Sequence, residues 1–233
     1  CPLYSGLISS YTDDAVEWGN QLKAAGAQGL LVFPVLPAFI GEPLSVEMIY
    51  EYHRAIGHGT KLPILGFRMR FLPDFNEELL TALAKDVPQF VGFKDGTNQM
   101  PQLSATLQVL RRLPRKLSIL TGNDSFILEV IMMGCDGGML GFAGTATDQL
   151  MAMHKATTEH DYATAFEIWG RLGPLARFCW GSPLRDYRPR MKELLVLEGK
   201  FPGATVRSPQ LGMRSSERSE LKRVAAHAGL ITL

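Results

Sequence analysis

Short apolar runs alternate with longer amphipathic stretches along the first part of the chain. This alternation is typical of βα units in a mainly parallel sheet. The run GLLVFP is uniformly apolar, as expected of a strand covered on both faces. The predicted strands are residues 3–9, 29–34, 62–67, 89–94, 117–121 and 137–142.

The amphipathic stretches carry the start and stop signals of helices. The stretch Thr12-Asp13-Asp14 offers a predicted N-cap, Ser45 is another, and Gly26 is a predicted stop signal. Between the strands, helices are predicted over residues 15–25, 46–56, 76–85, 102–112 and 125–133. After residue 147 the strand pattern stops, and the remaining helices are predicted over residues 148–159, 162–180, 188–198 and 215–228.

Regular βα units fit either an open doubly wound sheet or part of a (β/α)8 barrel. Neither a GxGxxG nor a GxxxxGK[ST] loop follows any predicted strand, so a nucleotide-binding open sheet lacks its phosphate-binding loop. The sequence therefore favours an α/β protein of the (β/α)8 TIM-barrel type, incomplete with six βα units. We expect a partial barrel in residues 1–146 and C-terminal helices packing on it in residues 147–233.

Composition limits the class of protein without naming a function. The 233 residues are 46% hydrophobic and 20% charged, with a net charge of +1, which excludes a mainly disordered chain. This balance gives no general attraction to nucleic acid or anionic membranes, so neither is an expected partner. Between residues 185 and 223, basic residues outnumber acidic ones ten to five. Because only two aromatic residues lie in this stretch, Tyr187 and Phe201, the excess favours a solvated helical face over a nucleic-acid surface.

Cysteine and histidine spacing bears on compartment and metal binding. The chain has three cysteines, Cys1, Cys135 and Cys179, and none of them form a CxxC pair. Their spacing argues against a disulfide scaffold or zinc cluster and fits a reducing cytoplasm. Histidine pairs five and six residues apart do not share one helical face with a carboxylate, so no metal site is expected. The longest apolar run, residues 30–40, is too short to span a bilayer.

Ligands meet the carboxyl ends of the strands in both candidate architectures. At one such end, alternation in QFVGFK places Phe90, Gly92 and Lys94 on one face. The low-dielectric walls of a barrel mouth lower the pKa of a lysine, and the neutral amine condenses with a carbonyl to a Schiff base. On spacing alone, the alternative is a solvent-facing lysine before an Asp-Gly turn.

Several segments together resemble one enzyme family. VGFKDGTNQM at residues 91–100 resembles the Schiff-base lysine strand of the dihydrodipicolinate synthase / N-acetylneuraminate lyase family. Within this segment, the tetrapeptide Phe-Lys-Asp-Gly is most similar to the 5-dehydro-4-deoxyglucarate dehydratase branch of the family. Residues 120–144 resemble the family's seventh and eighth strand region, residues 26–39 its fourth strand, and residues 206–230 its closing helix.

This resemblance implies a class I enzyme on a (β/α)8 barrel with C-terminal helices. Lys94 would attack the ketone of pyruvate or a related 2-keto acid. The iminium would then act as the electron sink for aldol, retro-aldol or dehydration chemistry. No cofactor is implied. The implied partners are a small 2-keto acid and, since the family forms tetramers, further copies of the chain in a dimer or tetramer.

The resemblance also implies the substrate-binding residues. Arg70 falls where the family handles a substrate carboxylate, a task suited to the guanidinium fork. Gly122 and Asp124 match substrate-side positions of strand seven, and Met139 lies where the family lines the barrel beside the imine. The alternatives are a surface arginine for Arg70, with Arg68 in a competing register, a helix N-cap for Asp124 and a core methionine for Met139.

Three departures from the family pattern bear on function. The family's catalytic tyrosine falls on Leu36, which has no proton to relay. The dehydratase branch of the family also carries a leucine at about this place, and this resemblance favours dehydration or a hydratase-aldolase reaction over dihydrodipicolinate synthesis. Leu65-Gly66 occupy the positions at which the family has a Tyr-Asn pair. The family's carboxylate loop follows strand two, whereas this chain resembles the family from strand three onward. A missing N-terminal stretch of roughly 50–60 residues or more is therefore expected.

These departures keep a second hypothesis open. The chain would then be a non-catalytic or degenerate family member that binds a keto acid or only assembles. The Lys94 strand favours the enzyme, whereas Leu36 and the missing first βα units favour the alternative.

Overall fold

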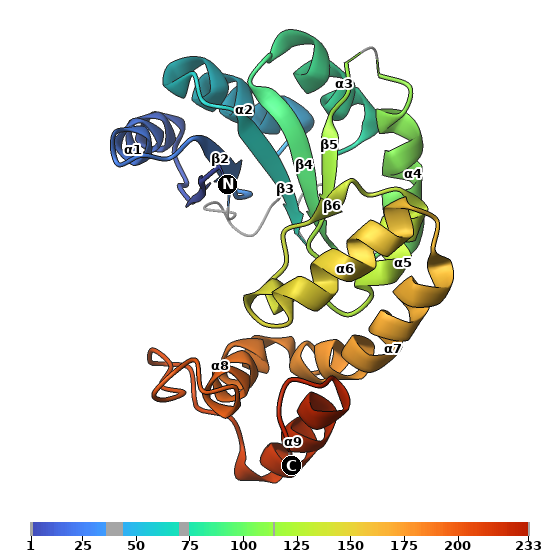
Figure 1. Ribbon diagram of the computed structural model, residues 1–233. Helices are drawn as coiled ribbons and strands as arrows, with labels where there is room; N and C mark the ends of the chain where they lie inside the picture. Colours follow the sequence, from blue (N-terminus) through green and yellow to red (C-terminus); the bar gives the residue numbers. More distant parts are fainter. Residues whose placement is uncertain (1, 36–43, 70–74, 114, 233) are drawn as a thin grey trace. The chain divides into compact units, whose positions relative to one another are not determined.

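The computed structural model describes residues 2–35, 44–69, 75–113 and 115–232 (Figure 1). Two of the predicted site residues, Leu36 and Arg70, lie outside these ranges. The chain divides into two compact units. The first comprises Cys1–Gly122 and Met133–Gly138, and the second comprises Asn123–Met132 and Met139–Leu233. The predicted domain boundary after residue 146 stays a prediction.

The first unit is built on a parallel sheet in which each strand pairs with the next strand along the chain. Its strands are β1 (Tyr4–Leu7), β2 (Gly29–Val32), β3 (Ile64–Met69), β4 (Phe90–Gly96), β5 (Ser118–Thr121) and β6 (Gly137–Gly138). A doubly wound sheet reverses its strand order at a switch point, so the sequential order observed here is that of a barrel. Within the described residues, β1 and β6 form the two edges of the sheet.

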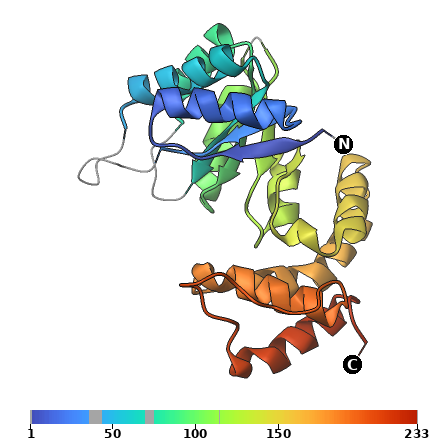
Figure 2. The same ribbon diagram turned by 90° about the vertical axis from the view of Figure 1, so that its left-hand side faces the viewer.

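Four helices cover one face of this sheet (Figures 1 and 2). They are α1 (Thr12–Ala24), α2 (Val46–Thr60), α3 (Glu77–Asp86) and α4 (Met100–Leu110). The predicted cap Ser45 is confirmed, since its Oγ accepts the N–H of Met48 at 3.3 Å. The cap predicted within Thr12-Asp13-Asp14 is wrong. All three residues are helical, because the backbone of Tyr11 already has the extended conformation of an N-cap.

β4 contains a bulge near its start, so its residues do not alternate between the two faces as the sequence predicted. Ile64 pairs with Phe90, but the next residue, Leu65, pairs with Gly92, so β4 holds one extra residue. Phe90 therefore lies on the helix-covered face, with its ring centroid 6.2 Å from that of His53 on α2. Gly92 remains on the face of Lys94. The placement of Phe90 beside Lys94 on one face was wrong, because a strict period of two does not allow for a bulge.

The second unit is helical and has its own core. Its elements are α5 (Ile127–Met133, mostly in this unit), η1 (Phe142–Gly144), α6 (Thr147–Thr158), α7 (Tyr162–Cys179), η2 (Leu184–Asp186), α8 (Tyr187–Leu197), η3 (Ser215–Glu217) and α9 (Arg218–His227). Phe142, Leu172 and Leu194 are completely buried in this core.

Several predicted elements differ in extent from the structure, and two of them also change type along their length. The strand expected over residues 137–142 is only two residues long, since its glycines favour strands weakly and Phe142 begins a short 3₁₀ helix. The helix expected over residues 215–228 begins as the 3₁₀ turn η3 before α9.

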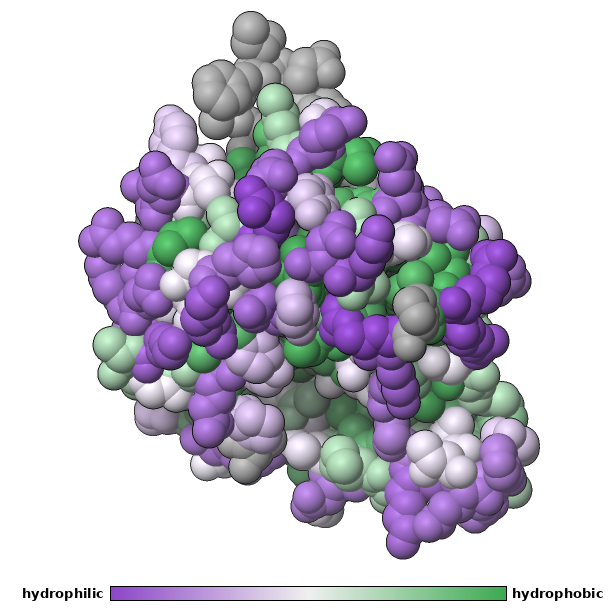
Figure 3. Space-filling model, turned by 90° about the horizontal axis from the view of Figure 1, so that it is seen from above, coloured by the Kyte–Doolittle hydropathy of each residue, from purple (hydrophilic) through white to green (hydrophobic). Residues whose placement is uncertain are grey.

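No helix among the described residues is long and apolar enough to cross a membrane. Hydrophilic residues predominate on the face shown in Figure 3, with smaller hydrophobic areas between them.

Candidate active site

Lys94 lies near the carboxyl end of β4, on the face of the sheet opposite α1 to α4. Its register partners are Phe67 of β3 and Leu120 of β5. The Nζ atom lies 4.3 Å from the centroid of the Phe67 ring, and Phe33 packs edge-to-face on Phe67 with centroids 5.0 Å apart. Lys94 is half-buried. An aromatic wall therefore faces the amine, and such a ring face attracts a positively charged nitrogen.

Gly122, which follows β5, leaves space for the Lys94 side chain. Its N–H donates to the backbone oxygen of Asp95 at 2.5 Å, so the backbone is fixed beside β4. A Cβ atom at Gly122 would lie 2.5 Å from Cε of Lys94, closer than real contacts allow. The structure thus brings Lys94 and Gly122 together, and only glycine fits there without displacing the lysine.

A buried polar network lies behind Lys94, on the opposite face of β4. Arg68 Nε donates to Oδ2 of Asp95 at 2.7 Å, and Thr97 Oγ1 donates to Oδ1 at 3.1 Å. Arg68 Nη1 also donates to Thr106 Oγ1 of α4 at 3.0 Å. Arg68 is 1% exposed, so it is not a surface arginine, and it does not share the face of Lys94. The network ties β3, β4 and α4 together behind the candidate nucleophile.

Asp124 and Met139 belong to the second unit. Asp124 is buried, and its Oδ1 accepts the N–H of Phe142 at 2.7 Å. The α-helix α5 begins at Ile127, three residues after Asp124. Met139 is half-buried. The expected substrate roles of Asp124 and Met139, like those of Leu36 and Arg70, stay predictions.

Sequence reasoning did not single out Phe67 or Asp95. The position of Asp95 could have been predicted from the sequence, because the residue after Lys94 must face the other side of the strand. The position of Phe67 could not have been predicted, because its place beside Lys94 depends on the parallel register of β3 and β4. The local sequence pattern does not determine that register.

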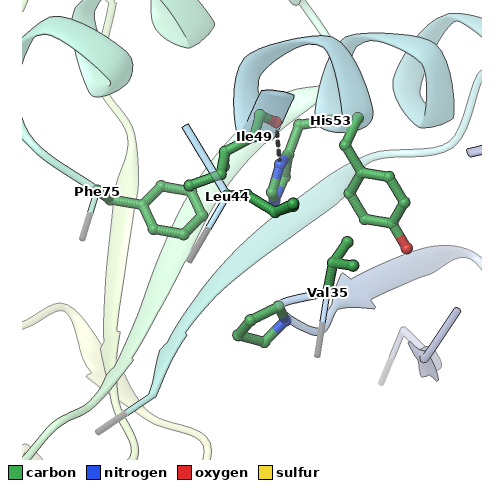
Figure 4. A pocket seen from close by; sticks show the side chains of 7 residues that line it. Val35, Leu44, Ile49, His53 and Phe75 are labelled. Carbon is green, nitrogen blue, oxygen red and sulfur yellow. Dashed lines mark hydrogen bonds between the residues drawn. The ribbon is translucent and has the colours of Figure 1, made fainter. Parts of the chain in front are cut away.

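A small apolar pocket lies on the helix-covered side, around His53 of α2 (Figure 4). The Nδ1 of His53 lies 2.8 Å from the backbone oxygen of Ile49, to which it donates in the neutral tautomer, leaving Nε2 as an acceptor. Burial lowers the pKa of His53 to about 4. The pocket volume is about 20 Å³, with Val35 and Phe75 among its walls. His53 is therefore a neutral core residue with no carboxylate partner among the described residues.

No set of potential metal ligands stands out in the described ranges. In them, no group of three or more His, Cys, Asp or Glu side chains is arranged to hold a metal ion.

The sequence matches one protein family almost from end to end. Residues 1–228 match the Dihydrodipicolinate synthetase family. An "Uncharacterized DapA-like lyase" of Thermofilum pendens is 26% identical over 97% of this chain and 73% of its own length. The 4-hydroxy-tetrahydrodipicolinate synthase of Bartonella bacilliformis is 27% identical over 99% of this chain and 75% of its own length.

Solved structures agree with the fold. The chloride-inhibited dihydrodipicolinate synthase of Acinetobacter baumannii, complexed with pyruvate, superposes with a TM-score of 0.84 at 21% identity. The match covers 99% of this chain and 76% of that one. At this identity the likeness shows the fold, and it confirms the barrel-type architecture expected from the βα pattern.

Proposed function

The chain belongs to the dihydrodipicolinate synthetase family, and we propose on that basis that it is a lyase that forms a Schiff base between Lys94 and a small 2-keto acid such as pyruvate. The observation that carries the proposal is the position of Lys94. It lies at the carboxyl end of a barrel strand, where this fold carries its active sites, with Phe67 beside its amine and Gly122 beside its chain. Relatives named as a lyase and as a synthase, and a solved relative complexed with pyruvate, support the same chemistry.

The proposed reaction begins at the Nζ atom. The neutral amine attacks the ketone carbon and a C–N bond forms. The carbonyl oxygen leaves as water after taking up one proton from the amine and one from solvent, which leaves a protonated imine, the iminium. The resulting iminium places a positive charge where the Phe67 ring already faces the nitrogen, so the ring stabilises it. The iminium withdraws electrons from the adjacent carbon, which permits aldol cleavage, aldol condensation or dehydration.

The other predicted residues complete the proposed site. Arg70 would bind the substrate carboxylate through its guanidinium fork, and Gly122, Asp124 and Met139 would contact the rest of the substrate. Leu36 would line the site but has no proton to transfer. The proton must then come from another group or from the substrate. The resemblance of Leu36 to the leucine of the dehydratase branch favours dehydration or a hydratase-aldolase reaction over dihydrodipicolinate synthesis.

Borohydride reduction in the presence of pyruvate tests the Schiff base directly. Reduction converts the imine into a stable secondary amine, and intact-mass measurement then detects one bound pyruvate carbon skeleton. The wild-type protein is expected to form this adduct, whereas a folded Lys94→Ala variant is not. A folded wild-type protein that forms no adduct would contradict the proposal.

The absence of a hydroxyl at Leu36 favours a second candidate, a family member that binds a keto acid without turnover or only assembles. Exchange of the pyruvate methyl protons in D₂O separates the two candidates. An enzyme that forms the enamine exchanges these protons, whereas a binding protein that stops at the imine, or never forms it, leaves them in place.

We also expect the chain to act in the cytoplasm as a dimer or tetramer. The two described cysteines, Cys135 and Cys179, are free and buried, as suits a reducing compartment. Light scattering on the purified protein tests the oligomeric state.

A further inference from the structure

The C-terminal helical unit contains a groove of about 600 Å³ that the proposed reaction does not use. Residues of α8 and of the segment 201–210 form most of its walls. Its apolar walls include Met191, Leu195 and Val206. A groove of this volume with apolar walls is of the size that small-molecule sites have.

The same groove is lined by three cationic side chains, Arg188, Lys192 and Arg207. The carboxylates nearest in sequence are already paired: Asp186 with Arg185 at 3.6 Å, Glu193 with Arg218 at 3.0 Å, and Glu198 with Lys200 at 3.1 Å. In the described part of the chain, none of the three lining cations pairs with a carboxylate. Lys192 instead donates to the backbone oxygen of Thr205. The groove therefore keeps a positive charge that its surroundings do not neutralise.

Aromatic contacts fix the cationic side of the groove. The Tyr187 ring stacks on Trp180, with centroids 5.1 Å apart and planes 26° apart. The guanidinium carbon of Arg188 lies 4.7 Å from the centroid of the same Tyr187 ring. Phe201, which also lines the groove, is 44% exposed. An exposed phenyl ring and a guanidinium that line the same groove suit a ligand that has both an apolar body and a negative charge.

We propose that this groove binds a small organic anion in which a carboxylate is joined to a flat or branched apolar body. Arg188 and Arg207 supply donors for the carboxylate, and Leu195 and Phe201 supply the surface for the body. This assigns a role to part of the basic excess between residues 185 and 223. A nucleic acid fits less well, because the Tyr187 ring that would stack on a base is already engaged by Trp180 and Arg188.

Calorimetric titration with 2-naphthoate tests the proposal. We expect saturable binding at one site. The neutral analogue 2-naphthalenemethanol lacks the charge and acetate lacks the apolar body, so each should bind at least about tenfold more weakly. Polyadenylate, which offers phosphates and bases, should bind more weakly than naphthoate.

Variants locate the site. Arg207→Gln and Phe201→Ser should each weaken naphthoate binding about tenfold, since one removes a charged donor and the other an exposed apolar contact. Arg171→Gln, which makes the same charge change at an exposed pair with Glu167 on α7, should not change the affinity. Lys94→Ala should also bind naphthoate normally, so this result is independent of the proposed lyase activity.

Four results would overturn the proposal. They are absence of naphthoate binding to the folded protein, equal affinity for acetate, unchanged affinity in both groove variants, and tighter binding of polyadenylate than of naphthoate.

Discussion

The guanidinium of Arg68 and the carboxylate of Asp95 form a buried ion pair, with 2.7 Å between Nη2 and Oδ2 and side chains 1% and 0% exposed. Asp95 is the residue after Lys94, and its backbone oxygen also accepts the N–H of Gly122. Contacts from β3 and from the end of β5 therefore fix the backbone beside the candidate nucleophile. A buried pair of this kind contributes less to net stability than to holding one arrangement of the strands.

Removing one partner of this pair should be costly. In Asp95→Asn the Arg68 charge stays buried without its counter-charge, and we expect the free energy of unfolding to fall by about 3–5 kcal/mol. Urea denaturation followed by circular dichroism measures this. Glu77→Gln removes a carboxylate from an exposed pair with Arg112 at 4.0 Å and should cost less than about 1 kcal/mol. Equal losses in the two variants would contradict a structural role for the buried pair.

Gly122→Ala should displace Lys94 without unfolding the protein. The added Cβ would lie 2.5 Å from Cε of Lys94, and the flexible lysine can move aside. Because a small misplacement of a reacting group slows its reaction, the rate of borohydride trapping should fall about tenfold or more. Gly203→Ala is the control, since a Cβ there meets no atom within 4 Å. A trapping rate that stays at the wild-type value in Gly122→Ala would show that Lys94 does not need this space.

Phe67→Leu should destabilise the proposed iminium on Lys94. The ring faces Nζ at 4.3 Å, and loss of its attraction for a cation should raise the pyruvate concentration for half-maximal trapping about fivefold. Phe67→Tyr keeps the ring face and should keep the wild-type value. Titration of adduct yield against pyruvate gives both numbers. If leucine and tyrosine behave alike, the ring does not act on the charged nitrogen.

The sequence pattern was sufficient for the fold but only partly for the site. Apolar runs and the cap at Ser45 predicted β2 and α2, because both signals are local. The bulge at Phe90 was not predictable, because it arises in the pairing of β4 with β3. Lys94 could be proposed from its strand end. Phe67 could not, since its place beside Lys94 depends on register between strands that lie far apart in sequence.

His53 should make stability depend on pH. Burial lowers its pKa from 6.5 to about 4, so the unfolded chain binds a proton between these values that the native state does not. The contribution of His53 to the free energy of unfolding is therefore fully present above pH 6.5. It is lost as the pH falls towards 4, by about 3 kcal/mol in total. Urea unfolding between pH 7 and 4 measures it.

His53→Phe is the matched variant, because a phenyl ring retains the edge-to-face packing on Phe75, now at 5.2 Å between centroids. Carboxylates titrate alike in both proteins, so the difference between their pH profiles reports His53. Parallel profiles for the wild type and the variant would contradict a buried neutral histidine.

The most direct test of the central claim is to locate the trapped adduct. The protein is incubated with pyruvate, reduced with borohydride, digested and mapped by mass spectrometry, with Lys116→Ala as a control at an exposed lysine. We predict a single modified residue, Lys94, in the wild type and in Lys116→Ala, and no adduct in a folded Lys94→Ala variant. An adduct on another lysine, or none in the folded wild-type protein, would contradict the account.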